Sequence, residues 1–120
     1  AVLYTPAIQP QMKVIGRVLK KYGFAAPDTE ELSGRALTEA VAKGLIAFGK
    51  SIHAPTKLTD LDGFGEKHVQ RILAAAKDPS LSMKLQNMPV PMTAEDVVPY
   101  MESVIRGAMD GDLSKILIKE

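Results

Sequence analysis

The stretch DLDGFGE at residues 60–66 combines three carboxylates with two glycines, residue types that can bind either a cation or a phosphate. An EF-hand calcium loop needs acidic side chains at its first, third and fifth positions, glycine at the sixth and glutamate at the twelfth. Only Asp60 and Asp62 fall on those acidic positions. The spacing therefore does not predict a calcium loop.

The glycines of this stretch indicate a different ligand. Residues 56–77 resemble the helix-hairpin-helix motif of DNA-binding proteins, in which backbone N–H groups at a helix start hold a phosphate without reading the base sequence. The residues with the matching spacing are Leu58, Leu61, Gly63, Gly65 and Val69. The carboxylates around the glycines nearly balance the neighbouring Lys and Arg, which weakens the attraction for phosphate. A helix-hairpin-helix module is the alternative interpretation of the chain.

No other residues form a recognisable catalytic or metal-binding pattern. His53 and His68 are the only histidines, and they lack the i, i+4 partner that builds a zinc-binding helix face. We interpret them as solvent-facing or singly hydrogen-bonded side chains. Cysteine is absent, and no serine lies in a nucleophile-elbow motif. The six methionines are interpreted as packing residues of the core.

The composition proposes no charged partner. The 15 Lys and Arg residues and 14 Asp and Glu residues are interspersed and give a net charge of +1. No long-range field therefore favours nucleic acid or an anionic membrane. No apolar run approaches the ~20 residues of a membrane span, and no leader-like segment opens the chain. We expect a soluble, cytoplasmic protein that binds neither nucleic acid nor membrane.

Apolar periodicity predicts helices in the first two thirds of the chain. The first is expected within residues 13–23 and ends at Gly23. A long helix is expected from about residue 29 to 52, started by a capping box of Asp28 and Glu31, with a broad apolar face. Glycines inside it are expected to permit close packing by a neighbouring helix. A further helix is expected over residues 66–77.

The last third predicts a short turn at residues 81–85, a proline-containing loop and a final helix. Thr93 and Asp96 form a capping-box candidate for that helix, Pro99 is expected to bend it, and Gly111 to end it. No segment alternates with period two, so no strand is predicted. The sequence therefore predicts an all-α fold, a bundle of about five helices in a single domain over residues 1–120.

Several short motifs follow one another in a characteristic order. Pro55 and Thr56 follow the long predicted helix, Asn87 and Pro91 lie in the proline-containing loop, and the last segment contains GDLSKI. In this order they resemble the C-terminal part of the iron-containing alcohol dehydrogenase family. The opening segment AVLYTP resembles the helix of that family that follows its last metal-binding histidine. The chain is thus interpreted as a C-terminal fragment of a longer protein, here called the parent.

The resemblance implies a two-domain parent that transfers a hydride between an alcohol or aldehyde and NAD(P). An N-terminal α/β domain would bind NAD(P), and the helical domain would hold Fe²⁺, or Zn²⁺ in its place, to polarise the alcohol oxygen. The family's metal ligands are expected upstream of Ala1, and none is carried onto His53 or His68. The fragment alone is therefore expected to contain no catalytic, cofactor-binding or metal-ligating residue and to be inactive.

The resemblance also implies two properties of the fragment. Asn87 and Met88 are expected to line the alcohol pocket of the parent. Absence of the parent's helices that carry the metal ligands is expected to expose apolar surface on the long helix and on AVLYTPAI, and so to favour self-association.

Overall fold

The computed structural model describes all 120 residues, and every regular element is helical. Five α-helices are present: α1 (Thr5–Lys21), α2 (Gly34–Ser51), α3 (Glu66–Ala76), α4 (Ser82–Gln86) and α5 (Glu102–Asp110). Shorter turns of helix connect them: η1 (Val2–Tyr4), η2 (Thr29–Glu31), η3 (Leu58–Asp60), η4 (Pro79–Leu81), η5 (Val97–Met101) and η6 (Leu113–Lys115). The predicted all-α fold with about five helices is confirmed. No helix has both the length and the apolar character needed to cross a membrane.

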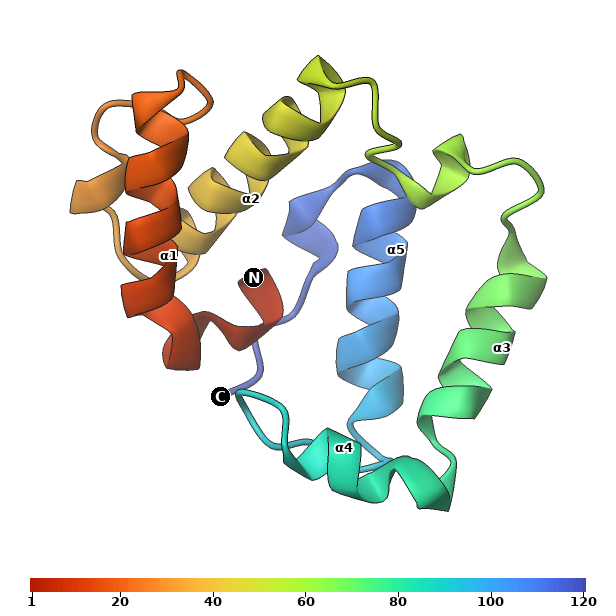
Figure 1. The fold of residues 1–120 in the computed structure, drawn as a ribbon. Coiled ribbons are helices and arrows are strands. Elements are labelled where there is room, and N and C mark those ends of the chain that lie inside the picture. Colours follow the sequence, from red (N-terminus) through yellow and green to blue (C-terminus); the bar gives the residue numbers. More distant parts are fainter.

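The helices, whose arrangement is drawn in Figure 1, pack around two apolar clusters. The smaller cluster lies between α1 and α2 and contains Met12, Leu19, Leu37 and Val41. The larger cluster gathers side chains from η1, α3, α4, η5 and the C-terminal segment. Its members are Val2, Leu3, Val69, Leu73, Leu85, Met92, Val97 and Ile116. The chain therefore starts in the larger cluster and passes directly into α1 of the smaller one.

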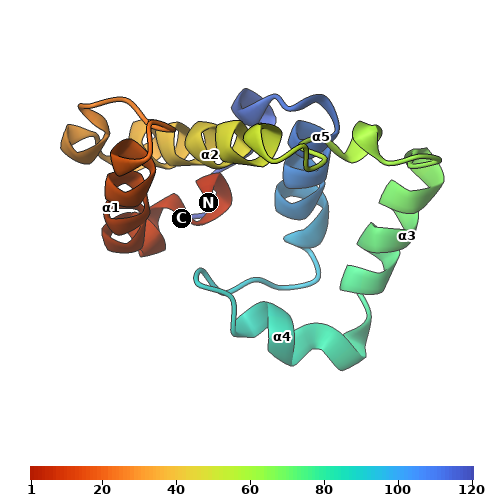
Figure 2. The same ribbon diagram turned by 45° about the horizontal axis from the view of Figure 1, so that its top comes forward.

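The N-terminal segment is held against the C-terminal segment. The backbone N–H of Lys119 donates to the carbonyl of Leu3 at 3.0 Å. Figures 1 and 2 both show the two termini close together, between α1 and α5. Val2 and Leu3 are buried. The expectation that AVLYTPAI would expose apolar surface is therefore wrong for these residues, because the larger cluster covers them.

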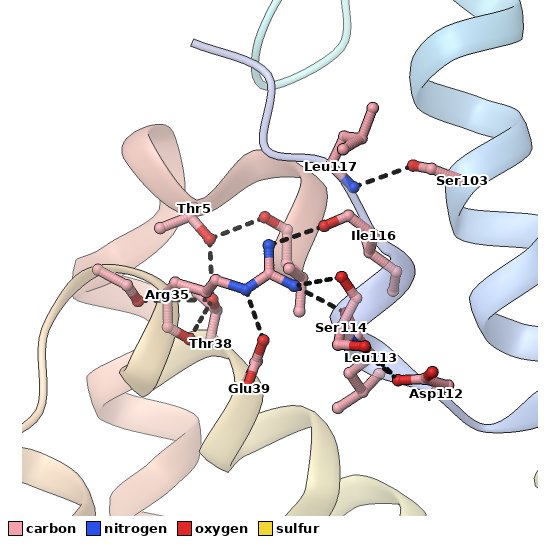
Figure 3. A network of polar contacts seen from close by, with 12 residues as sticks. Thr5, Arg35, Thr38, Glu39, Ser103, Asp112, Leu113, Ser114, Ile116 and Leu117 are labelled. Atoms are coloured by element: carbon pink, nitrogen blue, oxygen red, sulfur yellow. Dashed lines mark hydrogen bonds and ion pairs between the residues drawn. The ribbon is translucent and has the colours of Figure 1, made fainter.

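Arg35 of α2 joins the two parts of the molecule (Figure 3). Its Nη1 donates to the carbonyl of Ile116 at 2.8 Å, and its Nη2 donates to the carbonyl of Leu113 at 2.8 Å. Its Nε donates to Glu39 Oε1 at 2.6 Å, one turn along the same helix. A planar guanidinium can make these bonds together because its donors form a fixed fork. Arg35 thus fixes the C-terminal segment onto α2.

The first helix begins earlier than its apolar pattern predicted. Helix α1 starts at Thr5 rather than near residue 13, and it contains Pro6 and Pro10. Pro6 lies in the first turn, where a backbone N–H has no partner within the helix. Pro10 removes one backbone hydrogen bond near the start but leaves the remaining turns intact. The predicted stop at Gly23 is confirmed, since this glycine has a φ of +80° two residues beyond the helix.

The second helix is shorter than expected. Residues 29–31 form the separate turn η2, Leu32 is extended, and α2 begins at Gly34. The predicted capping box is wrong, because the side chain of Asp28 caps no backbone group. The N–H of Gly34 donates instead to Gln9 Oε1 at 2.7 Å. A side chain of α1 therefore supplies the acceptor at the start of α2.

One of the expected close approaches of glycine occurs at Gly44. A Cβ added there would lie 2.9 Å from Leu19 Cδ1 and 2.9 Å from the carbonyl oxygen of Phe24. The absence of a side chain lets the end of α1 and the following turn approach α2. The predicted role of this glycine in close packing is confirmed.

The irregularity expected near Pro99 takes the form of a π-helical turn. Residues 97–101 form η5, and the regular helix α5 begins only at Glu102. Asp96 Oδ2 accepts from the N–H of Thr93 at 2.9 Å, which is one half of the predicted capping box. A π-turn suits a proline because the missing N–H cannot make the usual bond four residues back. Gly111 ends α5 with a φ of +73°, as predicted.

Candidate functional site

The loop between α4 and η5 contains Asn87 and Met88, the two residues that the family resemblance implies for a substrate pocket. Both ends of this loop are anchored: Met88 N and Met92 N donate to the carbonyl of Leu85, at 3.2 and 3.0 Å. The side chain of Met92 is 1% exposed and belongs to the larger apolar cluster. The loop is therefore fixed on the core by a buried methionine and by a shared backbone acceptor.

Met88 contacts the N-terminal segment directly. The hydroxyl of Tyr4, in η1, donates to Met88 Sδ at 2.8 Å. Burial raises the pKa of Tyr4 above its ordinary value, so the phenol keeps its proton at neutral pH. The two residues are separated by 84 positions in the sequence. This contact brings the loop and the opening segment of the chain side by side.

Asn87 lies at the outer side of the same loop. Its backbone N–H donates to the carbonyl of Met83 at 3.1 Å, while its exposed side chain has no hydrogen bond within the chain. Neither Asn87 nor Met88 lines a cavity formed by these 120 residues. Of the two predicted pocket residues, only Met88 contacts Tyr4, and the chain by itself does not enclose a pocket around either residue.

The glycine hairpin of residues 61–65 adopts the expected sharp turn. Gly63 has a φ of +76°, which only glycine adopts without strain, and α3 begins at Glu66. The N–H of Gly65 donates to Nδ1 of His68 at 3.2 Å. The His68 ring stacks on Phe64 with a centroid distance of 5.4 Å. One of the backbone donors that a phosphate would need is therefore occupied by the protein's own histidine.

A carboxylate already occupies the first turn of α3. Glu66 forms two bonds to Arg106 of α5, with Nη1–Oε2 at 2.6 Å and Nη2–Oε1 at 2.8 Å. These bonds, followed by that from Gln70, lower the pKa of Glu66 to about 2. The helix start thus holds an intramolecular anion at neutral pH, which competes electrostatically with a phosphate.

The donor groups of this chain do not form a metal site. No group of three or more His, Cys, Asp or Glu side chains comes together among the 120 residues. His53 lies just beyond α2 and has a φ of +57°. His68 lies in α3, and its Nδ1 accepts a hydrogen bond from the N–H of Gly65. The residues present therefore do not fit Fe²⁺ or Zn²⁺ by themselves.

A second feature is an open groove between the C-terminal halves of α1 and α2, with a volume of about 500 Å³. All of its lining residues are apolar: Val14, Ile15, Val18, Leu19, Tyr22, Phe24, Leu45 and Phe48. Val14 and Val18 belong to the apolar spacing that predicted this helix. In the structure they are 56% and 52% exposed, because α2 packs against the face of α1 that carries Met12 and Leu19. The apolar pattern located the helix but not which of its apolar residues would be covered.

Comparison of the chain with protein-family models, with curated proteins and with solved structures found no match.

Proposed function

We propose that this chain is the C-terminal helical part of a metal-dependent, NAD(P)-linked alcohol dehydrogenase. The proposal rests on the resemblance of its motifs to the iron-containing alcohol dehydrogenase family. In the parent, a hydride would pass between an alcohol and the nicotinamide. The metal ligands and the nucleotide-binding domain would be supplied by residues outside this chain.

The contact between Tyr4 and Met88 is the observation that supports this proposal. By the resemblance, the segment containing Tyr4 follows the last metal-binding histidine of the parent. The hydroxyl of Tyr4 lies 2.8 Å from Met88 Sδ, so the loop of Asn87 and Met88 lies beside that segment. A loop at this place would face the substrate side of the metal centre. The thioether of methionine is an adaptable apolar surface for an alkyl chain.

The parent protein, loaded with Fe²⁺ or Zn²⁺, provides the test. It should oxidise simple alcohols with NAD or NADP. Met88→Ala should change the ratio of kcat/KM between short and long alcohols by about 1 kcal/mol or more, since an apolar wall of the pocket is shortened. Bound metal and thermal stability should be retained.

Met83→Ala is the matched control, because Met83 is 70% exposed and lies in α4 a few residues away. It should leave the ratio unchanged. A parent without alcohol-oxidising activity under any of these metal and cofactor combinations would contradict the proposed family. An active parent whose substrate profile ignores Met88→Ala would retain the family but assign the loop a purely structural role.

A further inference from the structure

The groove between α1 and α2 belongs to a continuous exposed apolar face. On α1, Val14, Val18 and Tyr22 recur every four residues and are 56%, 52% and 66% exposed. On α2, Leu45 and Phe48 are 45% and 44% exposed. Ile52 continues the same helical face and is 58% exposed. Contiguous apolar surface of this kind marks an interaction site more often than a scatter of single residues does.

Three lining residues of the groove pack closely. Phe24 and Phe48 meet edge to face with ring centroids 5.5 Å apart, and Leu19 is 7% exposed. Gly44 allows the carbonyl of Phe24 to approach α2 closely. Figure 1 shows α1 and α2 diverging toward their C-terminal ends, and the groove lies between these ends.

The charged residues of α1 itself are all basic. Residues 1–27 contain Lys13, Arg17, Lys20 and Lys21 but no Asp or Glu. Arg17 and Lys21 follow Val14 by three and seven positions, so they border the exposed stripe. Nζ of Lys21 lies 5.7 Å from the ring centroid of Tyr22. Arg17 has one ion-pair partner, the half-buried Glu30, at 3.5 Å, and Lys21 has none.

We propose that this groove docks an amphipathic helix of another protein whose apolar stripe is bordered by acidic residues. Val14 to Tyr22 spans about 12 Å along α1, two turns of helix, which matches apolar anchors at i, i+4 and i+7 of a bound helix. Glutamates along the edge of that helix would face Arg17 and Lys21.

A second copy of the chain is a poorer occupant of the groove. A twofold-symmetric contact places the same surface of each copy opposite itself. It would bring Arg17 and Lys21 of one copy toward those of the other, and like charges facing each other oppose association. The self-association expected from the sequence would use this same apolar surface. A second copy and an acidic helix would therefore compete for the groove.

Two synthetic peptides test the proposal against the 120-residue chain. Both carry the same Leu and Phe anchors at i, i+4 and i+7, with Glu flanking the stripe in one and Lys in the other. Calorimetric titration should show binding of the Glu peptide, weaker as salt is added, and little binding of the Lys peptide. Equal binding of both peptides, or of neither, would overturn the proposal.

Variants locate the binding surface. Val18→Glu places a charge in the exposed stripe and should weaken binding of the Glu peptide by about tenfold or more. Lys21→Glu should weaken it by about threefold, because it reverses one peripheral charge. Lys43→Glu is the matched control: it makes the same charge change on α2, where Lys43 lines a separate surface groove. If Val18→Glu fails to fold, the comparison of Lys21→Glu with Lys43→Glu still shows whether the Glu peptide binds beside α1.

Two further measurements address other occupants. Sedimentation should show a monomer, and vesicles of anionic phosphatidylglycerol should not bind through this face. A dimer that Val18→Glu dissociates and the Glu peptide leaves intact would show that the groove serves a second copy and would overturn the proposal. Vesicle binding that Val18→Glu abolishes, in the absence of peptide binding, would overturn it in favour of a lipid surface.

Discussion

The hydroxyl oxygens of Thr5 and Thr38 lie 2.8 Å apart and join the start of α1 to α2 in the protein interior. Thr5 is 4% exposed and Thr38 is fully buried. Each hydroxyl also lies within bonding distance of a backbone carbonyl, that of Val2 for Thr5 at 2.7 Å and that of Arg35 for Thr38 at 3.1 Å; since each hydroxyl has one proton, one donates to its carbonyl while the other donates across to it. Because of these local acceptors, either hydroxyl stays hydrogen-bonded when the other is removed.

Replacing either threonine by valine should therefore have a limited cost. Thr5→Val and Thr38→Val should each lower the free energy of unfolding by about 1 kcal/mol, the net value of a hydrogen bond, with no added penalty for an orphaned group. The double variant should cost less than the sum of the two, because the bond between them is lost only once. Urea denaturation of the native protein, the two single variants and the double variant gives the coupling free energy between the two hydroxyls. Ser51→Ala, which removes an exposed hydroxyl, is the control and should change little. Strictly additive costs would show that the two hydroxyls are not coupled.

Arg35 should contribute to stability through the shape of its side chain as well as its charge. Arg35→Lys keeps the charge but cannot reach the carbonyls of Leu113 and Ile116 together, so it should destabilise by about 1–2 kcal/mol. Arg17→Lys is the control: its side chain is 66% exposed and its contact with Glu30 is 3.5 Å long. This change should stay within about 0.5 kcal/mol. Hydrogen exchange should also quicken in the C-terminal segment of Arg35→Lys only. Equal effects of Arg35→Lys and Arg17→Lys would contradict the stabilising role of the bonds from Arg35 to the two carbonyls.

The ion pair of Glu66 and Arg106 predicts a pH dependence with a definite sign. The pKa of Glu66 is lowered from 4.5 to about 2 in the folded protein, so its contribution is present above pH 4.5 and disappears as the pH falls toward 2. The difference in Tm between the native protein and Glu66→Gln should therefore be largest near neutral pH and shrink over this window. The difference should be small throughout, because Glu66 is exposed and solvent screens the pair.

The exposed Glu31 forms no ion pair, so Glu31→Gln provides the reference for removing a surface carboxylate. Its Tm difference from the native protein should not follow the same pH course. A Glu66→Gln difference that grows as the pH falls below 4.5 would have the wrong sign for a lowered pKa and would refute the ion pair in solution.

The sequence predicted the helices more reliably than their starts. Helix periodicity and the stop glycines Gly23 and Gly111 identified the elements and two of their ends, because these signals are local. The start of α1 was missed because the apolar periodicity identified the helix only from residue 13; the structure begins it at Thr5, with Pro6 in the first turn, where proline is tolerated. The start of α2 depends on Gln9, a side chain from another helix, which no local pattern could reveal.

The candidate site depends still more on long-range contacts. The sequence selected Asn87 and Met88 from their loop, but the position of Tyr4 against Met88 follows from how the N-terminal segment packs on the larger cluster. The exposed groove also depends on long-range packing. Val14 and Leu19 are both apolar, and only the packing of α2 decides that Leu19 is covered and Val14 is left at the surface. Periodicity predicts which residues share a helix face, whereas the partner helix determines which faces are buried.

The last prediction concerns the glycine hairpin and DNA. We expect no binding of duplex DNA at physiological ionic strength, because the N–H of Gly65 is taken by His68 and the carboxylate of Glu66 lies at the helix start. Fluorescence anisotropy with a labelled duplex over a range of salt concentrations measures this directly.

The combined variant Lys67→Glu and Arg71→Glu would remove the cations nearest the hairpin, and Lys43→Glu with Lys50→Glu makes the same charge change on α2. Binding that falls steeply with salt and is lost in the first variant but kept in the second would establish a phosphate grip at the hairpin. Weak low-salt binding that both variants reduce equally would reflect only general charge, and would leave the hairpin as a connection between helices.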